Sequence, residues 1–253
     1  MKTNETALIS GASKGIGRET AAYFAQNKIN LILVARDFEA LKNLANEFTE
    51  KNKIKAVPVS VDISNQIEIE NKIRDAIEKI GGIDFLINLA GYPLDISLWK
   101  KMVHELKDDE ILKIMHVDFF GSLRLVRECI PYMIKNKKGV IINISSIPAI
   151  DGDIEGAAYA FSKSCCITLT KFIARQYGAY NIRAYTVALG SIKTNSTYDK
   201  LTELEKSQLA KETSLKRWGE PIEIAKLIYA LTRDDFSFVN GQTIIADGGV
   251  VMH

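Results

Sequence analysis

The sequence predicts an α/β fold, a single domain with a doubly wound parallel sheet of about seven strands and helices on both faces. Short apolar runs rich in Val and Ile alternate with stretches long enough for helices. Such regular alternation is typical of a parallel sheet covered on both sides. With 253 residues, 47% of them hydrophobic, the chain can bury a full core. No linker-like segment divides residues 1–253.

Seven apolar runs are expected to form the strands. In chain order they are residues 6–10, 30–35, 55–61, 83–88, 139–145, 182–188 and 243–249. The longer stretches between them are expected to form helices. These helices cover residues 16–27, 38–51, 67–80, 111–135 and 157–180. In such a sheet ligands gather beyond the carboxyl ends of the strands, so functional residues are expected there.

Charge and composition exclude several classes of protein. Lys and Arg number 33 against 31 Asp and Glu, a net charge of +2 with both signs interspersed, so no broad field attracts nucleic acid or an anionic membrane. No run approaches the roughly 18 apolar residues of a membrane helix, and the N-terminus lacks a signal-peptide core. We expect a cytoplasmic protein. Cys129, Cys165 and Cys166 have no metal-ligand spacing, so they are expected to be reduced core thiols, with no metal site.

A glycine-rich loop, SGASKGIG, follows the first expected strand and opens the first expected helix. Small residues let the backbone approach a pyrophosphate, whose charge then lies at the positive end of a helix. An ordinary strand-to-helix turn is the alternative. The candidate cofactor-binding residues of this loop are Gly11, Ser13, Lys14, Gly15, Ile16 and Gly17.

The end of the second expected strand usually decides the choice of cofactor. An acidic residue there binds the ribose hydroxyls of NAD, and a basic residue meets the 2′-phosphate of NADP. Arg36 stands at this point, and Lys14 is a second cation for the same phosphate. We therefore favour NADP(H). The alternative is that both cations are solvated and Asp37 binds the ribose.

The next two expected strands also end in candidate cofactor-binding residues. Asp62 and Ile63 follow the third strand, and the NLAG stretch after the fourth contains Asn88, Ala90 and Gly91. An acid at a strand end can accept a hydrogen bond from an adenine amino group, and small residues let a ribose lie close to the backbone. A turn or a cap is the alternative for these positions.

The YAFSK stretch places Tyr159 and Lys163 one helical turn apart, so their side chains share a face. A free tyrosine titrates near pH 10, and a nearby ammonium favours the phenolate and lowers that pKa. Ser146, at the end of the fifth expected strand, would reach the same end of the sheet. We expect Ser146 to hold a carbonyl oxygen while Tyr159 protonates it.

Together these motifs resemble the short-chain dehydrogenase/reductase family over nearly the whole chain. SGASKGIG corresponds to the family's TGxxxGxG, NLAG to NNAG and YAFSK to YxxxK, and the C-terminal VNGQTIIADGG is similar to that of bacterial 3-oxoacyl-acyl-carrier-protein reductases. The resemblance implies a Rossmann-type fold and NAD(P)-dependent hydride transfer. It also implies that Tyr159 is the acid or base, that Lys163 binds the nicotinamide ribose, and that Ser146 orients the substrate. A homotetramer or homodimer is the implied assembly.

Asp118 stands where the family has a catalytic asparagine. An ionised aspartate cannot donate a hydrogen bond, although it can accept one from a water in a relay to Lys163. Its charge should raise the pKa of Lys163 and oppose part of that lysine's effect on Tyr159. We expect a working but altered proton relay.

Leu189 replaces the proline of the family's Pro-Gly pair, and we expect a looser turn there because proline fixes a backbone angle. The resemblance still implies that Gly190, Ile192 and Thr194 contact the nicotinamide carboxamide and the phosphates.

Two segments are expected to border the substrate. Residues 92–117, about five longer than in the ketoacyl reductases the chain resembles, contain Trp99, Met102 and His104. They narrow substrate entry or form a plain surface excursion. Residues 191–219 correspond to a mobile lid in the family, with a plain pair of surface helices as the alternative.

The leading hypothesis is an NADP(H)-dependent reductase of a ketone or 3-oxoacyl group, with a small molecule or an acyl thioester as substrate. An NAD-dependent alcohol or sugar dehydrogenase is the alternative. A hypothesis of another class is a nucleotide-binding scaffold without turnover, because Asp118 and Leu189 depart from the family pattern.

Overall fold

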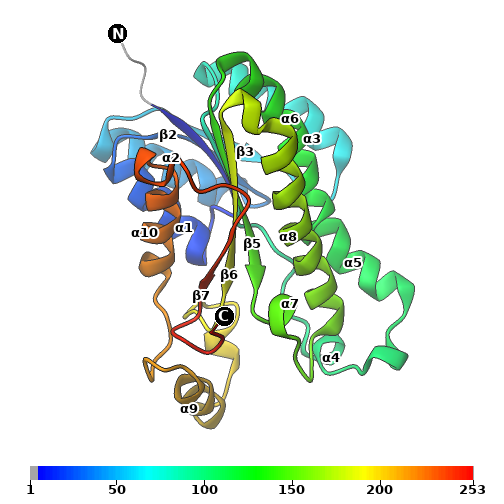
Figure 1. The fold of residues 1–253 in the computed structure, drawn as a ribbon. Helices are drawn as coiled ribbons and strands as arrows, with labels where there is room; N and C mark the ends of the chain where they lie inside the picture. Colours follow the sequence, from blue (N-terminus) through cyan, green and yellow to red (C-terminus); the bar gives the residue numbers. More distant parts are fainter. Residues whose placement is uncertain (1–4, 253) are drawn as a thin grey trace.

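The computed structural model describes residues 5–252, and it shows a seven-stranded sheet in the order β3-β2-β1-β4-β5-β6-β7. Every neighbouring pair of strands is parallel. Helices cover both faces of the sheet (Figure 1). The predicted doubly wound α/β fold is therefore confirmed.

The strands lie close to the predicted runs, because each run is short, apolar and β-branched. They are β1 Thr6–Ser10, β2 Asn30–Ala35, β3 Ala56–Ser60, β4 Phe85–Asn88, β5 Gly139–Ser146, β6 Ile182–Leu189 and β7 Thr243–Ala246. Successive residues of β1 point to opposite faces of the sheet. Ala7 and Ile9 pack in one core and Leu8 packs in the other.

The helices of the described residues are more numerous than the five predicted. They are α1 Gly15–Gln26, α2 Phe38–Asn52, α3 Gln66–Ile80, α4 Ile96–Trp99, α5 Asp108–Asp118, α6 Phe120–Asn136, α7 Pro148–Asp151, α8 Ala157–Tyr177, α9 Glu203–Glu212 and α10 Pro221–Leu231. The predicted helix over residues 111–135 is wrong as one element, because the chain breaks at Phe119 into α5 and α6. Beside the break, Gly121 lies so close to Ile63 that an added Cβ would be 2.6 Å from its Cδ1. The break lets α5 pack on α8 while α6 packs on α3.

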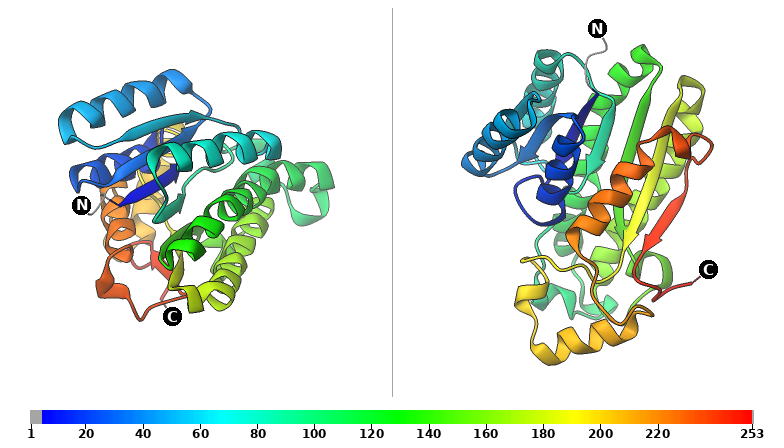
Figure 2. Two further views of the ribbon diagram at one scale, coloured as in Figure 1. Left: turned by 90° about the horizontal axis from the view of Figure 1, so that it is seen from above. Right: turned by 90° about the vertical axis from the view of Figure 1, so that its left-hand side faces the viewer.

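Two layers of helices enclose the sheet and divide the interior into two cores (Figures 1 and 2). Helices α1, α2 and α10 cover one face, where Phe24, Leu41 and Ile228 are buried. Helices α3, α6 and α8 cover the other face, where Ile73 and Leu125 are buried. The sheet is thus dry on both sides, as expected for parallel strands.

The carboxyl ends of the strands point to the end of the molecule where α4, α7 and α9 lie (Figure 1). This end contains the loop after β1, the start of α8 and the segment after β6. The candidate residues for chemistry are therefore gathered beyond the carboxyl ends of the strands.

No helix among the described residues is long and apolar enough to cross a membrane.

Candidate active site

The glycine-rich loop folds tightly on itself between β1 and α1. An added Cβ on Gly17 would lie 2.1 Å from the carbonyl oxygen of Gly11, so no other residue fits there. Gly11 has a positive φ of 70°, and a Cβ on it would lie 2.9 Å from the amide nitrogen of Ala90. The glycines therefore bring the loop against the end of β4, where the NLAG stretch lies.

The first turn of α1 is suited to an anion. Its N-cap residue, Lys14, makes no side-chain capping hydrogen bond, and the first turn has no acidic residue. In contrast, Asp37 caps α2 and Asn65 caps α3. Uncapped amides at the positive end of a helix bind phosphate. The Cγ2 of Thr194 approaches the same turn, 3.5 Å from where a Cβ on Gly15 would lie. The residues present therefore fit the pyrophosphate of a dinucleotide.

The residues after β2 and β3 are placed beside one another. Arg36 is exposed, whereas Asp37 uses its carboxylate to accept a hydrogen bond from the amide of Ala40. Asp62 accepts from both the amide and the hydroxyl of Ser64. Burial raises the pKa of Asp62, but the hydrogen bonds from Ser64 and the charge of Arg36 lower it below the usual value. Asp37 and Asp62 thus both have local hydrogen-bond partners, whereas the charge of Arg36 is exposed to solvent.

Asn88 and Ile63 point into the protein interior. Asn88 donates a hydrogen bond to Asn143 on β5 at 2.8 Å, and Asn143 donates to Thr170 on α8 at 2.9 Å. The Oδ1 atom of Asn88 has no hydrogen-bond partner among the described residues. Ile63 is buried in the core beneath α6. The structure gives these two cofactor candidates a packing role in joining strands and helices.

The four catalytic candidates converge at the start of α8. The Nζ of Lys163 lies 3.2 Å from the Oδ2 of Asp118, and both side chains are buried. The same ammonium lies 5.4 Å from the centroid of the Tyr159 ring. The Ser146 hydroxyl also acts on the phenol, because it lowers the pKa of Tyr159. Residues from β5, α5 and α8 therefore form one connected group.

Asp118 accepts two further hydrogen bonds. The amide of Tyr92 donates to its Oδ1 at 2.6 Å, and the hydroxyl of Ser162 donates to its Oδ2 at 3.2 Å. These contacts fix the carboxylate at the end of α5 and keep its negative charge beside Lys163. Sequence reasoning missed Ser162, although it directly precedes Lys163 in the YAFSK motif.

Burial and charge together set the titration of the tyrosine and the lysine. Burial lowers the pKa of Lys163, but the charge of Asp118, together with smaller contributions from Tyr159, Cys166 and the hydrogen bond to Asp118, raises it well above its ordinary value. Burial raises the pKa of Tyr159. Part of this side chain is accessible to solvent, but its phenol oxygen is surrounded by protein atoms. Lys163 and Ser146 lower that pKa and Asp118 raises it, and the net direction is upward because burial is the largest contribution. The expected lowering of the Tyr159 pKa by Lys163 is present, but burial and the charge of Asp118 outweigh it.

The turn after β6 is held by its neighbours. The carbonyl of Leu189 accepts hydrogen bonds from the amide of Ile147 at 3.1 Å and from the hydroxyl of Ser146 at 3.3 Å. Gly190 lies against Asp247 so closely that a Cβ would be 2.7 Å from the Cβ of Asp247. These contacts constrain the turn at the position where the family's proline is absent.

The segment over residues 191–219 lies across the same end of the sheet. Its two ends meet in a bridge between Ile192 and Gly219. Helix α9 within it has no buried residue. The Nζ of Lys200 donates a hydrogen bond to the carbonyl of Leu94 at 3.1 Å, which joins this segment to the loop after β4. Helix α9 is therefore thinly packed, while Ile192 and Trp218 near the two ends of the segment are buried.

Trp99 is a further residue at the site. Its ring centroid lies 5.5 Å from that of Tyr159, with the two planes tilted by 47°. The sequence indicated only that Trp99 belongs to the segment over residues 92–117, because the distance between Trp99 and Tyr159 along the chain hides the contact.

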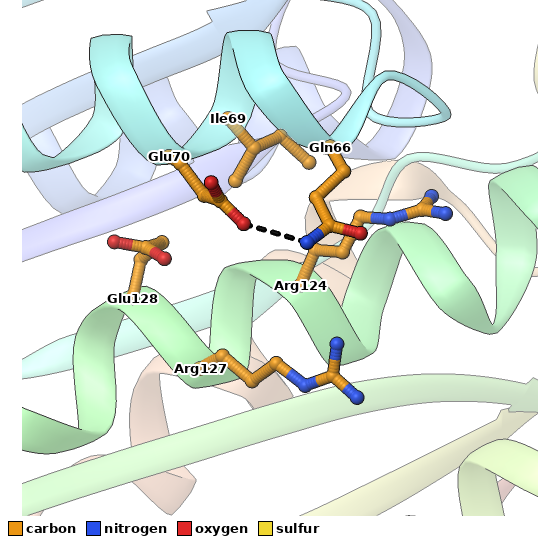
Figure 3. Close-up of a pocket in the computed structure, with 6 residues that line it drawn as sticks. All are labelled: Gln66, Ile69, Glu70, Arg124, Arg127 and Glu128. Carbon is orange, nitrogen blue, oxygen red and sulfur yellow. Dashed lines mark hydrogen bonds between the residues drawn. The ribbon is translucent and has the colours of Figure 1, made fainter.

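Two surface pockets lie away from this group. Figure 3 shows one between α3 and α6, where Glu70 accepts a hydrogen bond from Gln66 beside Arg124 and Arg127. Its volume of about 10 Å³ accommodates no more than a water molecule. The other, of about 430 Å³, lies at the opposite edge of the sheet, where Thr6 begins β1. Neither contains a catalytic candidate.

The chain is similar to known oxidoreductases over nearly its whole length. A family model described as enoyl-(acyl carrier protein) reductase matches residues 11–251. A 3-oxoacyl-acyl-carrier-protein reductase of Thermotoga maritima is 34% identical over 245 residues, which cover 97% of this chain and 97% of the relative.

Two similar solved structures contain a bound nicotinamide cofactor. A 3-oxoacyl-acyl-carrier-protein reductase of Brucella melitensis with bound NAD has a TM-score of 0.88 and 28% identity, covering all of this chain and 93% of that chain. L-Sorbose reductase of Gluconobacter frateurii, in complex with NADPH and L-sorbose, has a TM-score of 0.88 and 25% identity, covering 98% of this chain and 97% of that chain. Because the family model matches nearly the whole of this chain, the chain belongs to the short-chain dehydrogenase/reductase family. It is an NAD(P)-dependent oxidoreductase acting on carbonyl or alcohol groups.

Proposed function

We propose that the protein is an NADPH-dependent ketone reductase whose substrate class is a 3-oxoacyl thioester. The observation that supports this most is the convergence of Ser146, Tyr159 and Lys163 beside the glycine-rich loop. The name of the Thermotoga maritima relative favours the 3-oxoacyl class.

The proposed chemistry assigns one step to each side chain. When bound, the nicotinamide supplies the hydride that reduces the carbonyl carbon. Ser146 donates a hydrogen bond to the carbonyl oxygen and fixes its position. Tyr159 donates its proton to that oxygen, and its raised pKa keeps the phenol protonated and ready to act as an acid. Lys163, kept cationic by Asp118, stabilises the phenolate that forms and contacts the nicotinamide ribose.

The residues proposed to contact the cofactor also lie beyond the carboxyl ends of the strands. The loop from Gly11 to Gly17 and the first turn of α1 hold the pyrophosphate. Ala90 and Gly91 let the ribose lie close to the backbone, and Thr194 meets the phosphates from the lid over residues 191–219. The turn at Gly190 and Ile192 receives the carboxamide.

The preference for NADPH rests on two exposed cations. Arg36 follows β2 and Lys14 precedes α1, and within residues 5–252 neither forms a salt bridge. The competing acid, Asp37, already caps α2. A 2′-phosphate at this point would gain charge-assisted hydrogen bonds.

Reversing the charge with Arg36→Glu is expected to weaken NADPH binding by about 10- to 100-fold, because charge-assisted hydrogen bonds are lost and repulsion is added. NADH binding should change little. Titration of both cofactors by fluorescence measures this. Lys42→Glu, which reverses an exposed charge on α2, is the matched control. Equal weakening of NADPH and NADH, or no weakening, contradicts the assignment.

A substrate panel tests the proposed function. Acetoacetyl thioester, 2,3-butanedione, L-sorbose, an aldehyde and an enoyl thioester are each supplied with NADPH, and cofactor oxidation is followed. We expect the acetoacetyl thioester to give the highest kcat/KM. A preference for the enoyl thioester would instead point to reduction of a carbon–carbon double bond, the activity in the matching family's description.

A sugar ketone is the second candidate substrate. The Gluconobacter frateurii relative acts on L-sorbose and shares the fold over nearly its whole length. A preference for L-sorbose in the panel would favour this candidate over the thioester.

We further propose that the protein is cytoplasmic and assembles as a homotetramer or homodimer. Its three cysteines are free thiols, which suits a reducing compartment. Large apolar side chains are exposed on α5 and α8, namely Leu112, Phe161 and Phe172. Such side chains are typical of an interface between copies.

A further inference from the structure

Trp99 is held rigidly against the first turn of α8. Its carbonyl accepts a hydrogen bond from the amide of Gly156 at 2.8 Å. Gly156 has a positive φ of 77°, and a Cβ on it would lie 2.8 Å from Cη2 of the indole. The ring therefore lies directly on the glycine backbone, which leaves the indole no room to move toward the helix.

The short helix α4 fixes the position of Trp99 from the other side. Asp95 caps this helix by accepting hydrogen bonds from the amides of Ser97 and Leu98. Leu98 is buried in a small apolar cluster with Ile114 of α5. Trp99 is thus anchored to α8 through its own backbone and to α5 through its neighbour Leu98, and its side chain is not a loosely held surface group.

Trp99 lies at the end of Tyr159 away from the glycine-rich loop. Along α8, Gly156, Tyr159 and Lys163 follow one another at helical spacing and share one face. The Lys163 end is close to Gly91, because a Cβ on Gly91 would lie 4.0 Å from its Nζ, and the preceding Ala90 packs on the glycine-rich loop. Trp99 contacts the Gly156 end of this row and the ring of Tyr159.

The loop that contains Trp99 is also joined to the segment over residues 191–219. Lys200 donates its hydrogen bond to Leu94, five residues before Trp99. The charge of Lys100 also lowers the pKa of Glu205 on α9, whose hydrogen bonds to Thr202 contribute more to that lowering. The loop that contains the indole and this segment therefore lie next to each other.

We propose that Trp99 is a specificity-determining residue whose indole bounds the space for the substrate group beside the reacting carbonyl. Because Gly156 and Tyr159 hold the ring on two sides, that space accepts a short or compact substituent and resists a long one. This inference rests on the proposed ketone reduction at Tyr159. It names the size class of substrate that the site takes.

The test is the dependence of kcat/KM on substrate length. Thioesters with 3-oxo chains of 4, 6 and 10 carbons, and 2-alkanones of matching lengths, are assayed with wild type, Trp99→Ala, Trp99→Leu and Trp99→Phe. Wild type should lose about tenfold in kcat/KM between the shortest and the longest chain, the scale set by poorly fitted methylenes in a bounded pocket. Trp99→Ala should recover that loss, mainly through a lower KM for the longest chain. Trp99→Leu should recover part of it, and Trp99→Phe little.

Controls separate specificity from damage to the fold. Phe238→Ala removes a fully exposed aromatic side chain from the loop before β7, and its chain-length ratio should match wild type. NADPH affinity and Tm identify the Trp99 variants that are properly folded. An unchanged chain-length ratio in a folded Trp99→Ala or Trp99→Leu variant overturns the inference.

The two substrate series distinguish failure of the inference from failure of the proposed function. Turnover of 2-alkanones but of no thioester refutes the 3-oxoacyl class, and the ratios among the 2-alkanones then decide the role of Trp99. The absence of turnover in both series refutes the proposed function and the inference together.

Discussion

Tyr159→Phe is expected to lower the rate of ketone reduction by about 10²- to 10⁴-fold, the usual contribution of a positioned general acid. The variant keeps the ring that packs against Trp99 and Lys163 and removes only the hydroxyl. Cofactor affinity should stay close to that of wild type, because the glycine-rich loop is untouched. Stopped-flow oxidation of NADPH and a fluorescence titration measure the two quantities on the same sample.

Tyr180→Phe is the matched control for this prediction. Tyr180 is exposed beyond the end of α8, so removal of its hydroxyl should leave the rate unchanged. If Tyr159→Phe kept more than about a tenth of wild-type activity, proton donation by Tyr159 would be wrong. If wild type and variant bound NADPH equally but neither reduced any ketone, the hypothesis of a nucleotide-binding scaffold would gain support instead.

The fold was largely predictable because each strand is specified locally. Runs such as residues 30–35 are mostly apolar, include the β-branched Ile32 and Val34, and are followed by charged residues, so strand formation depends little on distant contacts. The break at Phe119 was not predictable, because residues 111–135 have a continuous helical pattern. It lies beside the close approach of Gly121 on α6 to Ile63, which belongs to the turn between β3 and α3. Helix α10 was also not predicted, although Pro221 at its first position and the buried Ile228 are typical helix signals.

The candidate site divides in the same way. Tyr159 and Lys163 belong to one helical turn, so their proximity follows from spacing alone. The contacts of Asp118 with Tyr92 and Ser162, and of Trp99 with Tyr159, join segments far apart in the chain. No pattern in a single sequence indicates such contacts. The direction of the pKa of Tyr159 was also beyond the sequence, because its largest cause is burial.

Asp118 changes the electrostatics of the site in a way that its usual counterpart, asparagine, does not. Its carboxylate is fully buried and forms an ion pair with Lys163, whose own side chain is 6% exposed. A buried pair of this kind is sensitive to loss of either partner, since the remaining charge is left without compensation. Asparagine has nearly the same shape and keeps one oxygen, which can accept the hydrogen bond from the amide of Tyr92. Its amide nitrogen then takes the place of Oδ2, where it can donate to the hydroxyl of Ser162, so Asp118→Asn removes the charge with little change of shape.

Asp118→Asn is expected to move the alkaline limb of the pH–rate profile for ketone reduction to lower pH. Reduction requires the protonated phenol, so the rate falls as pH rises through the pKa of Tyr159. Asp118 raises that pKa, and removing its charge lowers it, so protonated phenol is lost at a lower pH. For the same reason, alcohol oxidation, which requires the phenolate, should become faster at a fixed mildly alkaline pH. Profiles of kcat/KM in both directions measure the two effects.

Glu128→Gln is the matched control, because it neutralises another mostly buried carboxylate that is paired with Arg74 on α3, away from Tyr159. Its pH profile should match that of wild type, even where its Tm is lower. An unchanged profile in Asp118→Asn would show that the carboxylate does not act on the phenol. A shift of the alkaline limb to higher pH would reverse the assigned sign. A shift to lower pH, together with faster oxidation, would establish that this chain uses Asp118 to keep its tyrosine protonated and thereby favours reduction of the ketone.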